Sequence, residues 1–260
     1  KLLEAAVVVD PNFALAWGDL ARCHGRMNWF RGGGVDRTPA RLEKAKAAMD
    51  AAVRLAPDTP ETALNLGYHY FFVFRDNARA AEQFEKLLKL QPNNTAARFA
   101  LSFVQGALGQ RAEALANRLL VARQDPANGD YAAIGAGAAQ AARRYEDAVA
   151  LWRRVVQRHP DQPWERLALA LAEFEWRGST RPVDEFFASL PAAELNSPQG
   201  TLEQRDWALT QGKIAEALRF ESLRPAEGEE TNWTNAVRIA AAMASKGDST
   251  AARARLAKAP

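Results

Sequence analysis

The sequence predicts an all-α protein, built as a solenoid of about six to seven helix hairpins. Three observations support this fold class. A proline recurs at intervals close to 34 residues, and a leucine followed by a small residue keeps the same phase. Between these marks the chain is rich in alanine and places apolar residues three and four apart, which is the spacing of amphipathic helices.

The prolines define the repeat. They are Pro11, Pro57, Pro92, Pro126 and Pro160. The last three lie 34 residues apart, whereas the two earlier intervals are 35 and 46 residues. One extra residue lies between Leu66 and Ala80, and twelve lie between Leu20 and Ala45. We expect both insertions to fall between helices, because connections tolerate changes in length.

Each period is expected to hold two helices. The small residue that follows each leucine, such as Gly67, lets the second helix approach the first closely. Thr38-Pro39 and Thr59-Pro60 combine a capping hydroxyl with a proline that has no N–H to satisfy, which is typical of a helix start. The proline at the end of each period stops the second helix.

These residues resemble the tetratricopeptide repeat (TPR) signature. The resemblance rests on the leucine-small pair, the alanine that opens the second helix, the bulky residue four positions later (Phe84, Trp152) and the closing proline. It implies a right-handed α-α superhelix over residues 1–178, in which 1–11 is the tail of one unit and a long inter-helix insertion lies near 27–38. Residues 179–260 are expected to form divergent helical hairpins that continue the same solenoid, since Gly212 and Gly247 lie 35 apart between helical runs.

A narrower resemblance connects Asp10–Trp17 and Asp36–Leu42 with the TPR regions of bacterial multidomain signalling proteins. In that subgroup such arrays follow a nucleotide cyclase, a protein kinase or a transcription regulator. The chain starts at Lys1 inside an expected helix, so we interpret it as part of a larger bacterial protein. The sequence does not determine the compartment, although the cytoplasm is slightly favoured.

In TPR proteins the first helix of each pair lines the concave face. The resemblance therefore implies that the candidate site lies on the inward positions of the first helices. The expected partner-binding residues are Asn65, Tyr68, Phe71, Phe72, Phe99, Phe103, Gly137 and Gln140. The known carboxylate clamp of the family is absent, because its positions lack the required pair of cations. We expect the concave face to bind an apolar or amphipathic protein segment. In the alternative interpretation, the rings simply pack against the neighbouring helix pair.

No catalytic or metal-binding residues and no cofactor are predicted. Cys23-His24 are adjacent helical residues that point in different directions, and Gly32-Gly33-Gly34 lacks the Lys and Ser/Thr of a phosphate loop. The net charge of +3 does not indicate a nucleic-acid partner, and no apolar stretch is long enough to span a membrane.

The sequence therefore favours a non-catalytic protein–protein interaction module and does not indicate an enzyme. The alternative is a regulatory or dimerisation arm of a multidomain enzyme whose catalytic domain lies outside this chain. A weak homodimer would fit the second interpretation better.

Overall fold

The computed structural model describes residues 1–29, 38–223, 233–245, 247, 248, 250 and 252–254. The described residues form helices and contain no strand, which confirms the predicted all-α fold. They divide into two compact units, residues 1–172 and residues 173–260.

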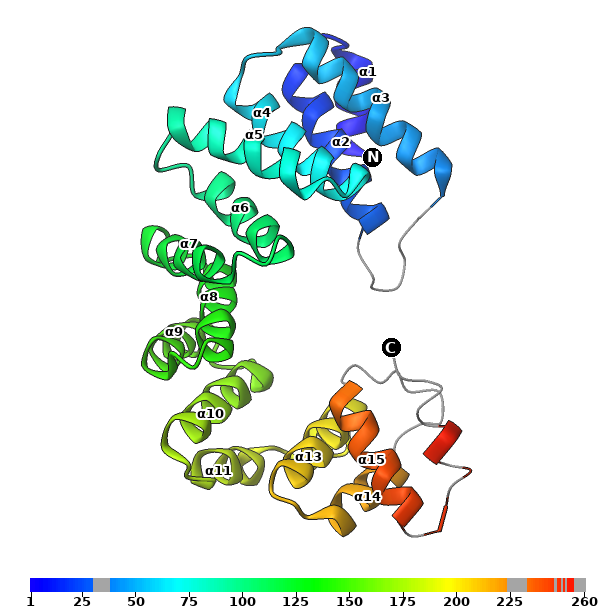
Figure 1. Ribbon diagram of the computed structural model, residues 1–260, viewed down its shortest axis with the longest axis vertical. Helices are drawn as coiled ribbons and strands as arrows, with labels where there is room; N and C mark the ends of the chain where they lie inside the picture. The colour runs from blue at the N-terminus through cyan, green and yellow to red at the C-terminus, as the bar shows by residue number, and fades with distance from the viewer. Residues whose placement is uncertain (30–37, 224–232, 246, 249, 251, 255–260) are drawn as a thin grey trace. The chain divides into compact units, whose positions relative to one another are not determined.

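The first unit consists of successive helix hairpins (Figure 1). Its helices are α1 (Leu2–Val9), α2 (Ala14–Trp29), α3 (Pro39–Leu55), α4 (Pro60–His69) with a π-helical turn (Tyr70–Phe74), α5 (Asn77–Leu90), α6 (Thr95–Ala107), α7 (Arg111–Gln124), α8 (Gly129–Ala141) and α9 (Tyr145–Arg158). Helix α10 (Pro163–Arg177) starts in this unit and crosses the boundary. Helices α2 and α3, α4 and α5, α6 and α7, and α8 and α9 pack as pairs.

The helix ends follow the local chemistry that the sequence predicts. Thr38 and Thr59 each accept a hydrogen bond, over 3.3 Å, from the backbone N–H three residues later. Helices α1, α3, α5, α7 and α9 each end two residues before one of the repeat prolines. Capping and the missing N–H of proline thus determine most boundaries.

A residue with positive φ stands between the two helices of a pair. Within the described ranges these residues are Arg75, Gly109, Arg143, Gly178, Gly212 and Gly247, and their spacing is 34, 34, 35, 34 and 35 residues. The period of these turn residues therefore extends past residue 178, although the apolar residues of the helices no longer keep the repeat spacing after that point. The continuation of the same solenoid over residues 179–260 stays a prediction. The regular spacing of the turn residues supports it.

The extra residue between Leu66 and Ala80 lies inside a helix, so the prediction that it falls between helices is wrong. In the turn after α6, the N–H of Gln110 bonds to the carbonyl five residues back, at Gln105. In the equivalent turn after α4, the N–H of Asp76 reaches six residues back, to Tyr70. The π-helical turn Tyr70–Phe74 accommodates the insertion by widening the last turn of the helix.

The twelve-residue insertion lengthens α2 and α3 to 16 and 17 residues, compared with 13 and 14 in α6 and α7. Residues 30–37, which include Phe30 and the glycine run, lie outside the described residues. Met27, in the last turn of α2, is 48% exposed.

The second unit contains α11 (Arg181–Ser189), α12 (Ala192–Leu195), α13 (Pro198–Thr210), α14 (Ile214–Ser222) and α15 (Trp233–Ser245). Residues 191–200, which are rich in proline and asparagine, are only partly a loop. Helix α12 forms there, and α13 begins at Pro198, where the hydroxyl of Ser197 accepts from the N–H of Gly200 at 2.9 Å. Proline in the first position of α13 starts this helix instead of preventing it.

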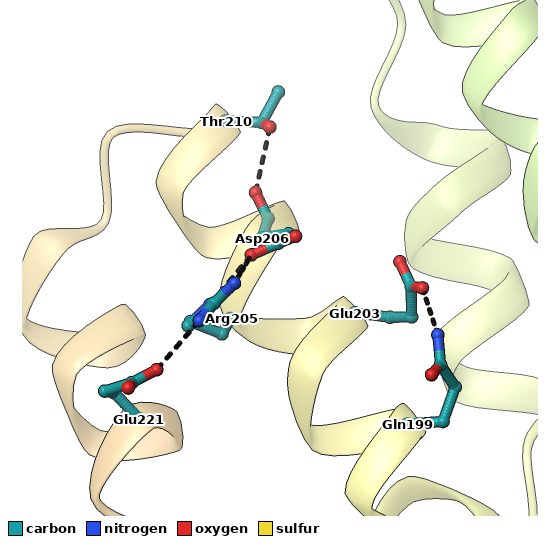
Figure 2. Close-up of polar contacts among 6 residues, drawn as sticks. All are labelled: Gln199, Glu203, Arg205, Asp206, Thr210 and Glu221. Atoms are coloured by element: carbon teal, nitrogen blue, oxygen red, sulfur yellow. Dashed lines mark hydrogen bonds and ion pairs between the residues drawn. The ribbon is translucent and has the colours of Figure 1, made fainter. Parts of the chain in front are cut away.

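A buried ion cluster connects α13 with α14, as Figure 2 shows. Arg205 has no exposed side-chain surface. Its guanidinium bonds to Asp206 Oδ1 at 2.6 Å and to Glu221 Oε2 at 2.9 Å. Burial and the nearby Asp206 raise the pKa of Glu203, which accepts a hydrogen bond from Gln199. The cluster therefore carries more carboxylates than cations.

Candidate partner-binding surface

The end of α4 and the π-helical turn that follows it carry three of the predicted aromatic residues. The Tyr68 ring stacks on Phe72 with 5.4 Å between the ring centroids, and it meets the edge of Phe84 at the same distance. Phe72 is only 8% exposed, whereas Tyr68 and Phe71 are partly buried against the α5–α6 core. Tyr68 and Phe71 thus present some surface to a ligand, and Phe72 presents little.

The Tyr68 ring lies beside the guanidinium of Arg22, which already forms an ion pair. The Arg22 guanidinium lies 5.6 Å from the Tyr68 ring centroid and forms an ion pair with Asp19 at 3.0 Å. Burial raises the pKa of the Tyr68 hydroxyl, and Arg22 opposes this shift. The phenol is therefore neutral at physiological pH and acts as a packing and hydrogen-bonding group.

Asn65 is nearly inaccessible, with 2% of its surface exposed. Its Nδ2 donates to Asp19 Oδ1 over 3.4 Å, and its Oδ1 accepts no hydrogen bond from the described residues. Asn65 lines a hollow of about 370 Å³ between the starts of α2 and α4. Phe13 and Leu15, which are 46% and 44% exposed, contribute apolar surface to the same hollow.

A second aromatic group, the α6–α8 aromatic cluster, consists of Phe99, Phe103 and Tyr131. Phe99 meets Phe103 edge to face at 4.9 Å and lies 4.6 Å from the Tyr131 ring of α8. All three side chains are partly exposed. The guanidinium of Arg118, from α7, lies 5.2 Å from the Phe103 ring centroid.

Gly137 and Gln140 lie on α8 and differ in their surroundings. Among the described residues no atom lies within 4 Å of the position that a Cβ on Gly137 would take. Gln140 accepts a hydrogen bond from Trp152 Nε1 over 3.3 Å. A Cβ on Gly135, by contrast, would lie 3.2 and 3.3 Å from side-chain atoms of Leu151 and Ala122, so this glycine allows a close helix crossing.

The structure thus groups the predicted aromatic residues in two sets, and Asn65, Gly137 and Gln140 belong to neither. Tyr68, Phe71 and Phe72 form one set, and Phe99 and Phe103 form the other. Sequence reasoning missed Tyr131 and Arg118. It omitted Arg118 because only the first helix of each pair was searched, although Arg118 stands four residues after Ala114, where other repeats carry a bulky residue.

The buried histidines belong to the core of the first unit. His24 Nδ1 lies 2.7 Å from Arg41 Nη1, and burial together with Arg41 lowers the pKa of His24. Burial lowers the pKa of His69 to about 4. The searched part of the chain has no group of three or more His, Cys, Asp or Glu residues that could hold a metal ion. None of the helices in the described ranges combines the length and apolar character needed to cross a membrane.

Comparisons with known proteins identify the class of fold. No family model matches the chain, and no curated protein matches it. Solved structures do match. A tetratricopeptide repeat protein from Parabacteroides merdae ATCC 43184 has a TM-score of 0.67 at 16% identity, over 83% of this chain and 84% of that chain.

Two further structures have the same type of fold. PilW, a type IV pilus biogenesis factor, has a TM-score of 0.59 at 20% identity, over 77% of this chain and 86% of its own. MamA from AMB-1 has a TM-score of 0.51 at 17% identity, over 69% of this chain and 90% of its own. The chain is therefore an α-helical repeat protein with a TPR-type fold, as its sequence predicts.

Proposed function

We propose that the chain is a non-catalytic protein–protein interaction module that binds an apolar or amphipathic segment of a partner. The binding surface is formed by the first helices of successive pairs, α4, α6 and α8. The observation that carries this proposal is the set of partly exposed rings on these helices, at Tyr68, Phe71 and the α6–α8 aromatic cluster.

Aromatic side chains suit this role because they contribute large apolar contact areas with few rotatable bonds. The rings of the α6–α8 aromatic cluster touch one another across two repeats, so neighbouring rings restrict their orientation. An ordered apolar surface of this kind favours binding, because less entropy is lost when a partner segment docks. Gly137 adds an open place on α8 that a partner side chain could occupy.

The test is a pull-down from the source organism with the wild-type chain and a Phe99→Ala/Phe103→Ala double variant. Both rings are partly exposed, so their loss should leave the fold intact while the captured partner decreases at least about tenfold, as expected for aromatic anchors. Leu90→Ala is the matched control, because Leu90 is 70% exposed on α5, a second helix of a pair. The control should retain the partner.

Equal capture by the double variant would overturn the assignment of the surface. Thermal unfolding of each variant separates binding from folding. If the double variant unfolds at a much lower temperature than Leu90→Ala, the rings are core residues and the alternative interpretation is correct.

A further inference from the structure

One position of the repeat changes its chemistry in the third hairpin. Four residues after the alanine that opens each second helix stand Met49, Phe84, Arg118 and Trp152. Met49 and Phe84 are 2% and 0% exposed, and Trp152 packs against the α8–α9 core. Arg118 is therefore the charged member of a series whose other members are apolar packing residues.

A side chain at this position reaches the first helix of its own pair. Phe84 meets Tyr68 of α4, and Trp152 donates to Gln140 of α8. Arg118 reaches Phe103 of α6 in the same way, and its Nη2 lies 3.5 Å from the position that a Cβ on Gly106 would take. The glycine leaves room for the guanidinium beside the α6–α8 aromatic cluster.

The Arg118 guanidinium has no anionic partner among the described residues. The guanidinium lies against the Phe103 ring, and its Nε is buried without a hydrogen-bond acceptor among the described residues. Burial lowers the pKa of Arg118, and no charged group of the described chain counteracts that shift. A ring face offsets only part of the cost of desolvating a cation, so the site favours an added anion.

We propose that Arg118 binds a carboxylate of the partner segment, an Asp or Glu side chain that stands next to an apolar residue. The inference rests on the proposed function and specifies its ligand. The two terminal nitrogens of the guanidinium match the two oxygens of a carboxylate, and the neighbouring apolar side chain contacts Phe99, Phe103 and Tyr131. The site differs from the family's carboxylate clamp, because the cation comes from the second helix of a pair.

The direct probe is phenylacetate, which combines a carboxylate with an aromatic ring, and phenylacetamide is its uncharged analogue. The resonance of the Arg118 Nε–H group is followed by NMR during titration of the wild-type chain. Phenylacetate should shift this resonance in a saturable way, and phenylacetamide should bind at least about tenfold more weakly. Equal responses to both probes, or no saturable shift with phenylacetate, would overturn the proposal.

Arg118→Met supplies a second, independent measurement. Methionine keeps the apolar stem and removes the unpaired charge, so the midpoint of urea unfolding should stay constant or rise, while phenylacetate binding is lost. Arg123→Met is the matched control, because Arg123 is an exposed arginine of the same helix whose Nε donates to the carbonyl of Leu119. The control should bind phenylacetate as the wild type does. A clear fall of the urea midpoint in Arg118→Met would instead assign Arg118 a purely structural role.

The results of the phenylacetate titration do not depend on the result of the pull-down. If no partner is captured but phenylacetate binds through Arg118, the proposed function fails and the carboxylate site remains. If a partner binds and its affinity is the same for wild type and Arg118→Met, the proposed function remains and the carboxylate site is wrong.

Discussion

Glu221 of α14 accepts a hydrogen bond from the fully buried Arg205 of α13, and the two charged atoms lie 2.9 Å apart (Figure 2). The Glu221 side chain is only 9% exposed, so neither charge can be hydrated well if the other is removed. The two opposite charges of this pair therefore neutralise each other and link α13 to α14 in the second unit. Its disruption should be far more costly than the loss of an ion pair on the surface.

Arg205→Met should lower the free energy of unfolding by about 3 to 5 kcal/mol, the cost of leaving a buried charge without its partner. Urea unfolding of the whole chain, followed by far-UV circular dichroism, measures this change. The control is Arg181→Met, because Arg181 pairs with Glu185 on α11 with side chains 81% and 63% exposed. It should change stability by less than about 0.5 kcal/mol. Similar effects of the two substitutions would show that the Arg205 cluster is effectively hydrated.

The stability of the first unit should depend on pH through His69. The ring is 5% exposed and lies 5.1 Å from the Phe74 ring centroid, and burial lowers its pKa to about 4, while Asp50 partly opposes and Lys46 reinforces the shift. In the unfolded chain the histidine binds a proton below about pH 6.5. The unfolded state therefore binds more protons between pH 6.5 and 4, and stability should fall as the pH decreases through this range.

The shift corresponds to a loss of up to about 3 kcal/mol at pH 4. Urea midpoints of wild type and His69→Asn at pH 7.5, 6, 5 and 4.5 should converge as the pH decreases, because the variant lacks this titration. His24, whose pKa is also lowered, contributes equally to both proteins. A constant difference between the two proteins over this pH range would contradict the prediction.

Local chemistry made much of the fold predictable from the sequence. The capping hydroxyls of Thr38 and Thr59 and the repeat prolines act within a few residues of themselves, so their effects can be read without tertiary information. Gly67 is of the same kind, since a small residue stands at this position in each period. These signals determine where helices begin and end and which faces pack.

The missed features depend on interactions that sequence periodicity does not report. The inward residues of α4 were counted with the α-helical period, but the chain becomes π-helical at Tyr70, so the count is shifted by one residue there. This explains why Phe72, predicted to face the groove, is 8% exposed. Arg118 lies on a second helix, and its significance depends on the lack of an anionic partner among the described residues, which only the packed structure reveals.

The turn residues with positive φ allow a further test. Arg143 has a φ of 58° and Gly109 a φ of 79° at equivalent turns. The left-handed region costs a residue with a Cβ roughly 1 kcal/mol. Arg143→Gly should therefore leave stability unchanged or raise it by up to about 1 kcal/mol, and Gly109→Ala should lower it by about 1 kcal/mol. Chemical unfolding of both variants measures these values, and a stabilised Gly109→Ala would refute the argument.

Two glycines on first helices of a pair give opposite predictions for the same substitution. A Cβ on Gly67 would lie 2.5 to 2.8 Å from atoms of the Phe84 ring, whose side chain is fully buried in the core. Gly67→Ala must therefore displace the ring or separate α4 from α5, and we expect a loss of about 1 to 3 kcal/mol. Replacing Phe84 with leucine in the same chain should recover part of that loss, because the shape of leucine relieves the clash.

Gly137→Ala is the matched control, because no described atom lies within 4 Å of the position its Cβ would take. Alanine has a higher helix propensity, so this variant should be more stable by about 0.5 to 1 kcal/mol. Urea unfolding of the two single variants and of the Gly67→Ala/Phe84→Leu double variant checks both signs. If Gly67→Ala is as stable as wild type, the close approach of α4 and α5 does not depend on the missing side chain, and the explanation for a small residue at this place in the repeat fails.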